Sequence, residues 1–410
     1  MRNKIPKHWQ VKKLGEICEI NPKTEISEIS DMDNVSFIPM SCVEAEKNKF
    51  TTIDSQYKVV KKGYTKFKDN DVLFAKITPC MENGKICIVN DLKFGFGFGS
   101  TEFHVLRPNI YTLSKYTYFF VSQACFRKRA EKFMTGAVGQ RRVPAKYLVD
   151  LEIPLPSLDE QNLIVKKIER CFEKIDFAIS NFKKSKELIE IYKQSVLSHA
   201  FNGKLTNSNL NSWQVKKLCD TSDIITGSTP PKNEPKFYGN EYPFFKPTDL
   251  NDGYLVKFAR DNLSEAGKQI SRQLPPKSVL VTCIGATIGK TGLIRVEGSC
   301  NQQINAIVPK ENLLPEYVYF YVISAQFQNL ILENASSTTL PILNKSKFEA
   351  LPILLPPLSE QNLIVAQIEK RFKAADNALN LIEQNLKKAE ILKQSILSKA
   401  FNGELVKDKK

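Results

Sequence analysis

Two stretches of the chain carry apolar residues at steps of three and four, with charged residues between them. This spacing gathers apolar side chains on one side of an α-helix and is typical of a coiled-coil seam. Ser157 and Glu160 form a capping-box signature, and Asn202-Gly203 and Asn402-Gly403 are helix stop signals. We predict two long helices, the first from about residue 159 to 201 and ~60 Å long. The predicted seam residues are Val165, Ile168, Phe172, Ile175, Ile179 and Phe182 in the first helix, and Val365, Ile368, Phe372, Ala375, Leu379, Ile382, Leu386 and Ala389 in the second.

The regions outside these helices have a different pattern. They are rich in aromatic and β-branched residues, Gly and Pro, and their apolar runs are short. Such runs between turn residues predict strands. We therefore predict an α+β domain with a curved β-sheet in each region. The expected strands lie at 72–75, 85–89, 278–282 and 305–308, and short helices are expected at 115–123 and 316–325.

The sequence also repeats itself. Leu155–Val165 recurs as Leu355–Val365, and Lys193–Gly203 recurs as Lys393–Gly403, both 200 residues further on; Trp9–Leu14 recurs as Trp213–Leu218. The chain is therefore two similar halves, each a variable region followed by a long helix, and the obvious partner for each helix is its repeat. The predicted boundaries are 1–152 for the first domain, 153–205 for the central helix, 206–352 for the second domain and 353–410 for the distal helix and C-terminal tail.

Composition narrows the class of protein. The 410 residues are 42% hydrophobic and 25% charged, as in soluble globular proteins. We find no run of eighteen apolar residues and no apolar core of a signal peptide at the start, so we expect a cytoplasmic protein that does not enter a membrane. The nine cysteines form no CxxC pair and the three histidines lie far apart, which favours buried free thiols over a metal site.

Charge points to a polyanionic partner. The net charge is +15, and residues 1–152 carry +8 of it whereas residues 206–352 carry +2. A basic balance of this size is compatible with nucleic-acid binding but does not establish it.

The motifs that would support catalysis are incomplete. Gly285–Thr291 resembles a P-loop, but three residues separate its glycines where four are needed, so we predict a strand-turn-strand there. Gly95–Gly99 is too short for a dinucleotide fingerprint; we expect a Gly-rich loop that holds aromatics near a surface, followed by a strand at Ser100–Phe103. Neither a nuclease carboxylate-lysine site nor the tetrapeptide of amino-methyltransferases is legible, and we predict no catalytic residues in this chain.

The arrangement of these motifs resembles a known family. Each half has a variable domain, a helix that opens with Leu-Pro-x-Leu-x-Glu-Gln, and a helix end with Lys-Gln-Ser-x-Leu-Ser-x-Ala-Phe-Asn-Gly. This is similar to the DNA-specificity (S) subunit of Type I restriction-modification systems, over essentially the whole chain. Segments 71–85 and 97–103 resemble one subtype of target-recognition domain, and segments 226–230, 283–290 and 301–307 resemble another.

The resemblance implies a division of labour. The two target-recognition domains would each recognise half of an asymmetric bipartite site in double-stranded DNA, and the long helices would form an antiparallel coiled coil that docks two modification (methyltransferase) subunits. S-adenosylmethionine would belong to those subunits, and ATP and Mg2+ to the restriction/translocase subunits, so we expect no cofactor in this chain. A standalone DNA-modifying enzyme and a structural coiled-coil scaffold are the alternatives.

Candidate DNA contacts follow from residue chemistry. Phosphate contacts come mainly from Lys and Arg, and base contacts from Arg, Lys, Asn, Gln, Ser and Thr on loops. In the first domain, the segment Gly136–Arg142 combines flexible glycines with adjacent arginines. The predicted DNA-binding residues are Lys76, Thr78, Arg127, Gln140, Arg141 and Arg142 in the first domain, and Lys246, Ser336, Ser337, Thr338, Thr339, Asn344 and Lys345 in the second.

Overall fold

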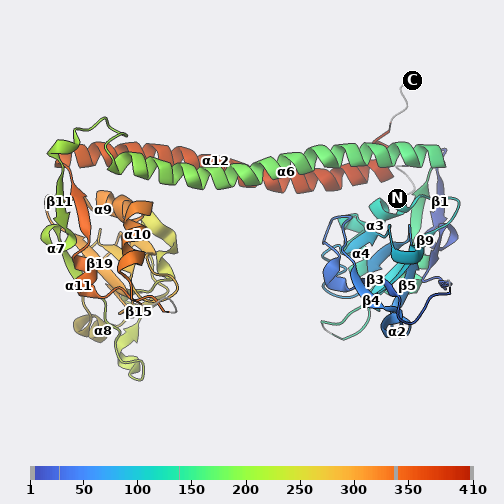
Figure 1. Ribbon diagram of the computed structural model, residues 1–410, viewed down its shortest axis with the longest axis horizontal. Helices are drawn as coiled ribbons and strands as arrows, with labels where there is room; N and C mark the ends of the chain where they lie inside the picture. Colours follow the sequence, from blue (N-terminus) through green and yellow to red (C-terminus); the bar gives the residue numbers. More distant parts are fainter. Residues whose placement is uncertain (1–4, 27, 138, 337–339, 407–410) are drawn as a thin grey trace. The chain divides into compact units, whose positions relative to one another are not determined.

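The computed structural model describes residues 5–26, 28–137, 139–336 and 340–406 (Figure 1). The chain forms two compact units: unit 1 comprises Met1–Phe182 with Gln384–Lys410, and unit 2 comprises Lys183–Glu383. The boundary falls inside both long helices, α6 (Leu158–Phe201) and α12 (Leu358–Phe401). Each unit therefore contains one β-rich domain and a part of each helix.

The first domain is built on two four-stranded sheets and a ribbon. One sheet has the order β2-β9-β6-β7, the other has the order β4-β3-β8-β5, and β1 pairs with β10. All pairs are antiparallel except β3 with β8. The strands are β1 (Gln10–Lys13), β2 (Cys18–Ile20), β3 (Asn34–Ile38), β4 (Ile53–Gln56), β5 (Thr65–Lys68), β6 (Val72–Ala75), β7 (Ile86–Ile88), β8 (Phe96–Gly99), β9 (Phe103–Pro108) and β10 (Glu152–Leu155), and the helices are α1 (Leu14–Ile17), α2 (Tyr57–Val60), α3 (Ser114–Val121), α4 (Ala124–Glu131) and α5 (Ala145–Val149).

The second domain follows the same plan with different pairings at its edge. Its sheets have the orders β12-β19-β16-β17 and β13-β15-β14-β18, and β11 pairs with β20. The parallel pair β14-β18 corresponds to β3-β8. The strands are β11 (Gln214–Lys217), β12 (Ser222–Thr226), β13 (Tyr238–Gly239), β14 (Tyr242–Phe245), β15 (Asp261–Leu263), β16 (Val279–Thr282), β17 (Thr291–Leu293), β18 (Ser299–Cys300), β19 (Ile304–Pro309) and β20 (Pro352–Leu355), and the helices are α7 (Leu218–Thr221), α8 (Glu265–Ile270), α9 (Pro315–Val322), α10 (Ala325–Asn334) and α11 (Lys345–Glu349).

The α+β class, the strands and the short helices that the sequence predicts are confirmed. The segment 285–289 is a turn between β16 and β17, as expected for a strand-turn-strand. One prediction was wrong: Phe96–Gly99 is a buried central strand and not a surface loop. A Cβ on Gly97 would lie 2.8 Å from the Phe67 ring, so the glycines let neighbouring rings and backbone approach. The expected strand starts later, at Phe103, and residues 100–102 form a turn.

Within each unit, α6 and α12 run antiparallel. In unit 2, Lys186 Nζ lies 2.9 Å from Glu383 Oε1, and Lys193 Nζ lies 2.6 Å from Asp376 Oδ1. The second pair is seven residues later in α6 and seven residues earlier in α12, so the helices run in opposite directions. The predicted seam residues are all buried or half-buried. The seam is not purely a helix-helix contact, because Val165 and Ile168 also belong to the core of the first domain.

The repeated motifs join each domain to the start of its long helix. Glu160 Oε1 accepts a hydrogen bond from the indole of Trp9 at 2.9 Å, and Glu360 Oε2 accepts one from Trp213 at 3.0 Å. The predicted capping box is therefore only half formed: Glu160 N donates to Ser157 Oγ at 3.3 Å, but the Glu160 carboxylate bonds the tryptophan instead. This contact ties the first strand of the domain to α6.

The neighbouring glutamine is completely buried in both repeats. Gln161 accepts from Leu113 N at 3.0 Å and donates to Tyr111 O at 2.9 Å; Gln361 makes the same bonds to the corresponding turn of the second domain. Buried backbone groups need such partners. The Glu-Gln pair of the repeat is thus a structural joint.

The other end of each helix is joined to a domain by the second repeated motif. In unit 1, Phe401 packs edge-on against Tyr116 at 5.0 Å, and Gln394 accepts from Ala124 N at 2.8 Å. In unit 2, Phe201 and Gln194 make the equivalent contacts with α9 and α10. Each helix ends in a glycine with a φ of 75°, which confirms the predicted stop signals.

Candidate nucleic-acid interface

Three segments of the first domain meet beyond the ends of β6 and β8. Lys76 N, just after β6, donates to Glu102 O at 2.9 Å in the turn that follows β8. Lys76 O accepts from Val143 N at 2.9 Å, and Thr78 N donates to Arg141 O at 3.0 Å. We call these three segments the first loop cluster. They are the segment after β6, the turn after β8 and the segment before Val143.

The segment before Val143 is itself a closed loop. Thr135 and Arg142 exchange both backbone hydrogen bonds, at 3.0 and 2.8 Å. Gly136 has a φ of 120°, and a Cβ there would lie 2.9 Å from Gln140 O. Glycine is required for this return of the chain. The loop presents Gln140 and Arg141 at the surface of the cluster.

The second domain builds an equivalent frame. Cys283 N donates to Gln303 O at 2.7 Å, Cys283 O accepts from Leu343 N at 2.8 Å, and Gly285 N donates to Pro341 O at 2.9 Å. These bonds repeat, one by one, those of the first cluster. We call the corresponding segments the second loop cluster.

Its closing pair is equivalent as well. Ser336 and Ile342 exchange both backbone hydrogen bonds, at 2.9 and 3.1 Å, as Thr135 and Arg142 do. Matching the two patterns makes Glu102 equivalent to Gln303 and Arg142 equivalent to Ile342. The two domains thus present different side chains from one backbone frame.

Charge dominates the first cluster. Arg142 donates from Nε and Nη2 to the two carboxylate oxygens of Glu102, both at 2.9 Å, and from Nη1 to Gln140 O at 2.9 Å. The pKa of Glu102 is lowered, chiefly by the hydrogen bond from Arg142, with a smaller contribution from the charge of Lys76. The carboxylate therefore stays ionised and holds the guanidinium in place.

Amide groups dominate the second cluster. Asn301 Nδ2 donates to Gln303 Oε1 at 2.9 Å, and Gln302 pairs with Thr229. Asn305 accepts from Thr226 Oγ1 at 2.7 Å. These side chains carry both donors and acceptors without a formal charge.

The predicted DNA-binding residues lie in several different surroundings. Lys76, Thr78, Gln140, Arg141 and Arg142 all lie in the first loop cluster. Lys246 follows β14 beside the second cluster, where Asn301 N bonds Phe245 O, and Ser336 closes its loop. Asn344 and Lys345 are exposed at the start of α11, directly after Leu343. Ser337, Thr338 and Thr339 lie outside the described residues.

Arg127 differs from the rest. Its side chain is 7% exposed, Nη1 donates to Ser122 O at 2.6 Å, and Nη2 pairs with Glu46. It has almost no surface to offer DNA, and its contacts hold the domain together.

Sequence reasoning missed Glu102, Asn301, Gln302 and Gln303 as members of the clusters. A signal is present in the family-like segments 97–103 and 301–307, which overlap at this turn when the two domains are matched. The pattern at residues 100–103 predicts a strand, and this prediction hides the turn that presents Glu102.

A hollow of about 610 Å3 adjoins the first cluster. Lys23, Lys66 and Lys76 line it, together with Glu25 and the side of β9. Beneath it, His104 Nε2 is hydrogen-bonded to Val143 O at 2.8 Å and its Nδ1 to Asn21 at 3.0 Å. Three lysines around one depression give a surface suited to phosphate groups.

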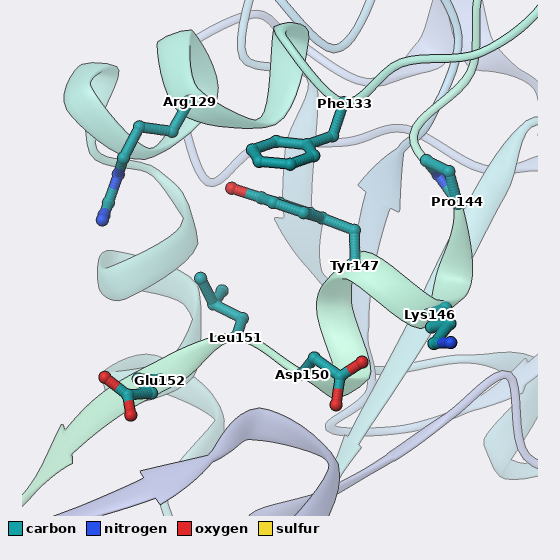
Figure 2. A pocket seen from close by; sticks show the side chains of 8 residues that line it. All are labelled: Arg129, Phe133, Pro144, Lys146, Tyr147, Asp150, Leu151 and Glu152. Atoms are coloured by element: carbon teal, nitrogen blue, oxygen red, sulfur yellow. The ribbon is translucent and has the colours of Figure 1, made fainter.

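A second hollow, of about 660 Å3, lies between α4, α5 and β10 (Figure 2). The ring of Phe133, 58% exposed, stacks on Tyr147 with centroids 4.9 Å apart. Asp150 at its edge pairs with Lys13 at 2.9 Å. The second domain has Asn334 and Lys347 in place of the two rings, so the domains differ on this face too.

Among the residues that the structure describes, no group of three or more His, Cys, Asp and Glu side chains is arranged to hold a metal ion. No described helix is long and apolar enough to cross a membrane.

The paired domains, the antiparallel helices and the two loop clusters define a DNA-specificity protein of the restriction-modification class. The sequence profile described as "Type I restriction modification DNA specificity domain" matches residues 6–189 and 211–391, so the chain belongs to this family.

Individual relatives agree. The chain is 23% identical to the Type I restriction enzyme StySPI specificity subunit of Salmonella potsdam, over 98% of this chain and 90% of that protein. It is 26% identical to the EcoKI specificity subunit of Escherichia coli K12, over 88% and 80%. With the EcoAI specificity subunit of Escherichia coli it is 40% identical, but over 39% of this chain and 27% of that protein's length.

Solved structures share the fold. A chain from a type I R-M system, studied for complex assembly and conformational transition, matches 98% of this chain and 99% of its own length with a TM-score of 0.80 and 21% identity. The HsdS subunit from Thermoanaerobacter tengcongensis matches 98% of both chains with a TM-score of 0.64 and 21% identity.

Proposed function

We propose that this protein is the DNA-specificity subunit of a Type I restriction-modification complex. Each domain recognises one half of an asymmetric bipartite site in double-stranded DNA through its loop cluster. The observation that carries the proposal is the pair of equivalent backbone frames bearing unlike side chains. Two identical half-sites would call for like side chains, whereas Glu102 with Arg142 and Gln303 with Ile342 suit unlike sequences.

The long helices are the proposed docking site for two modification subunits. Several apolar side chains on them are exposed: Phe177 is 70%, Ile191 65%, Leu363 58% and Ile391 68% exposed. Apolar surface of this kind supports a protein partner rather than DNA. A scaffold role alone does not account for two loop clusters with different chemistry.

Catalysis is assigned to the partners. The modification subunits would use S-adenosylmethionine, and the restriction/translocase subunits would use ATP and Mg2+. We expect the isolated chain to show no methyltransferase, nuclease or ATPase turnover. Turnover by a homogeneous preparation supplied with DNA, Mg2+ and S-adenosylmethionine would contradict this and favour the alternative of a standalone enzyme.

Methylome sequencing tests the proposal. The chain is expressed with its modification subunits in a host free of other methyltransferases, and every modified base is mapped. We expect one bipartite motif with two different half-sequences, absent when the chain is omitted. Methylation that does not depend on this chain would contradict the proposal.

A further inference from the structure

The two loop clusters place unlike side-chain pairs at one equivalent position, and this difference has a chemical meaning. Glu102 and Arg142 in the first domain correspond to Gln303 and Ile342 in the second, because the backbone hydrogen bonds around them match. We infer that this position determines specificity: Glu102–Arg142 recognises a G·C pair in one half-site, and Gln303–Ile342 recognises an A·T pair in the other. The inference rests on the proposed function.

The guanidinium of Arg142 is already held in place by other residues of the domain. A guanidinium has five N–H groups, and Glu102 and Gln140 O take three of them. One N–H remains on each of Nη1 and Nη2, on a side chain that is 41% exposed. The outer edge of a guanidinium, where Nη1 and Nη2 lie side by side, matches the O6 and N7 acceptors of guanine in the major groove, and Glu102 occupies the other edge, formed by Nε and Nη2. Because Glu102 already fixes the plane of the guanidinium, little side-chain freedom is lost on binding.

The second domain lacks any charge at this position. Gln303 Oε1 accepts a hydrogen bond from Asn301 Nδ2 at 2.9 Å. The side-chain amide of Gln303 still offers its N–H groups as donors and the second lone pair of Oε1 as an acceptor. A glutamine amide matches the N6 and N7 groups of adenine, and an alkyl side chain contacts the thymine methyl. Ile342 is 37% exposed at the position of Arg142, and Leu340 beside it is 53% exposed. The pair therefore suits A·T, and its alkyl group has nothing to offer the polar edge of guanine.

An exchange of the two pairs tests the inference. In the complex with the modification subunits, Glu102→Gln with Arg142→Ile is compared with the wild type by selection from duplexes randomised around the mapped site. We expect one position of the first half-site to lose its preference for G·C by about tenfold or more, while the second half-site is unchanged. Gln303→Glu with Ile342→Arg should alter one position of the second half-site only.

A matched control removes an ion pair elsewhere in the first domain. Lys93 and Asp54 form an exposed ion pair at 2.5 Å. Lys93 precedes β8, whereas the first loop cluster follows the other end of this strand. Lys93→Ile with Asp54→Asn should leave both half-sites unchanged, and melting curves of all variants verify folding.

Base analogues give a second test without any variant. With the wild-type complex, 7-deazaguanine removes the N7 acceptor and should weaken binding about fivefold or more at one position of the first half-site. Uracil in place of thymine removes the methyl group and should weaken binding a few-fold in the second half-site, and this loss should disappear in Ile342→Ala. Folded exchange variants with wild-type preferences, or analogues without effect in either half-site, overturn the inference. A wild-type complex that selects no bipartite sequence overturns the proposed function as well.

Discussion

Lys193 pairs with Asp376 across the two long helices of unit 2 at 2.6 Å, and its ammonium group lies over the ring of Phe372 at 5.5 Å from the centroid. The repeat counterparts Lys393 and Asp176 make the same contact in unit 1 at 2.5 Å. Each unit therefore has this charged contact between its two helix segments. Polar contacts in a seam specify the register of paired helices.

We expect Lys193→Met to destabilise unit 2 by about 1 kcal/mol, from the combined loss of a partly exposed ion pair and a cation–π contact. Denaturant unfolding followed by helix content provides the measurement. Lys186→Met is the control: both members of the Lys186–Glu383 pair are about half exposed, so its effect should be within 0.5 kcal/mol or so. Equal effects of the two substitutions would show that the Lys193 contact has no special role.

Gln161→Ala should be more damaging. The substitution leaves the backbone N–H of Leu113 and the carbonyl of Tyr111 without their partner, and Gln161 itself is fully buried. We expect a cost of about 3 kcal/mol. Asn162→Ala, one residue further on and exposed, should change the free energy of unfolding by less than about 0.5 kcal/mol. Thermal unfolding of both variants distinguishes a joint from a tolerant surface position.

DNA binding should depend strongly on salt, because lysines and arginines surround the first loop cluster. We expect Arg141→Ala to weaken binding to all sequences alike and to reduce the log–log salt slope by roughly 0.9, the contribution of one phosphate contact. Its Nη2 lies 3.7 Å from a carboxylate oxygen of Glu131, and 39% of the side chain is exposed, so the guanidinium is accessible to DNA. Titrations at several salt concentrations give the slope; Lys93→Ala should keep the wild-type value. An unchanged slope for Arg141→Ala would remove this residue from the interface.

Stability of the first domain should fall in acid because of His104. Burial lowers the pKa of this imidazole below 6.5, so the unfolded chain takes up a proton at a higher pH than the folded domain does. Stability is then lost as the pH falls from the unfolded pKa towards the folded one. The second domain has Asn305 at the equivalent position, and His104→Asn should flatten this part of the pH profile. Unfolding at pH 8, 6.5 and 5 provides the comparison; an identical slope in the variant would assign the effect to another group.

The helices should set the spacer of the recognised sequence. Duplicating one heptad in each helix at the boundary between the units, residues 176–182 and 377–383, adds ~10 Å of helix, or about three base pairs. We expect the same two half-sequences separated by a longer unspecified spacer in the methylome. An insertion at Asn202-Gly203 should not act in this way, because Gly203 packs against Leu210 within unit 2. An unchanged spacer in the variant with the duplicated heptads would contradict the prediction that the helices set the spacer length.

The sequence predicts the first long helix to within one residue, because its signal is local. Apolar periodicity and a terminal Asn-Gly need no information about distant contacts. The half-formed capping box was not predictable, since Glu160 bonds Trp9, which lies 151 residues away. The same holds for Phe96–Gly99, whose glycines suggest a loop until the neighbouring Phe67 ring explains them.

The candidate site was predictable in part. Adjacent arginines and glycines marked the Thr135–Arg142 loop, but the burial of Arg127 depends on Glu46 from a distant segment. Glu102 was not predictable as a member of the site, because the local pattern predicts a strand at residues 100–103 and gives no sign of the turn that brings the carboxylate to Arg142. Its role becomes visible only when it is found bonded to Arg142.

The division of the chain into units also has a consequence for synthesis on the ribosome. Unit 2 is a continuous segment, Lys183–Glu383, and all of its residues are available once Glu383 has emerged. Unit 1 is discontinuous, and its core includes Leu397, Ala400 and Phe401. The first domain is therefore synthesised first but completed last. Its helix α3 stays exposed until the last turns of α12 have been synthesised and can pack against it. A message truncated after residue 383 would leave the second domain supplied with all its residues and the first without part of its core.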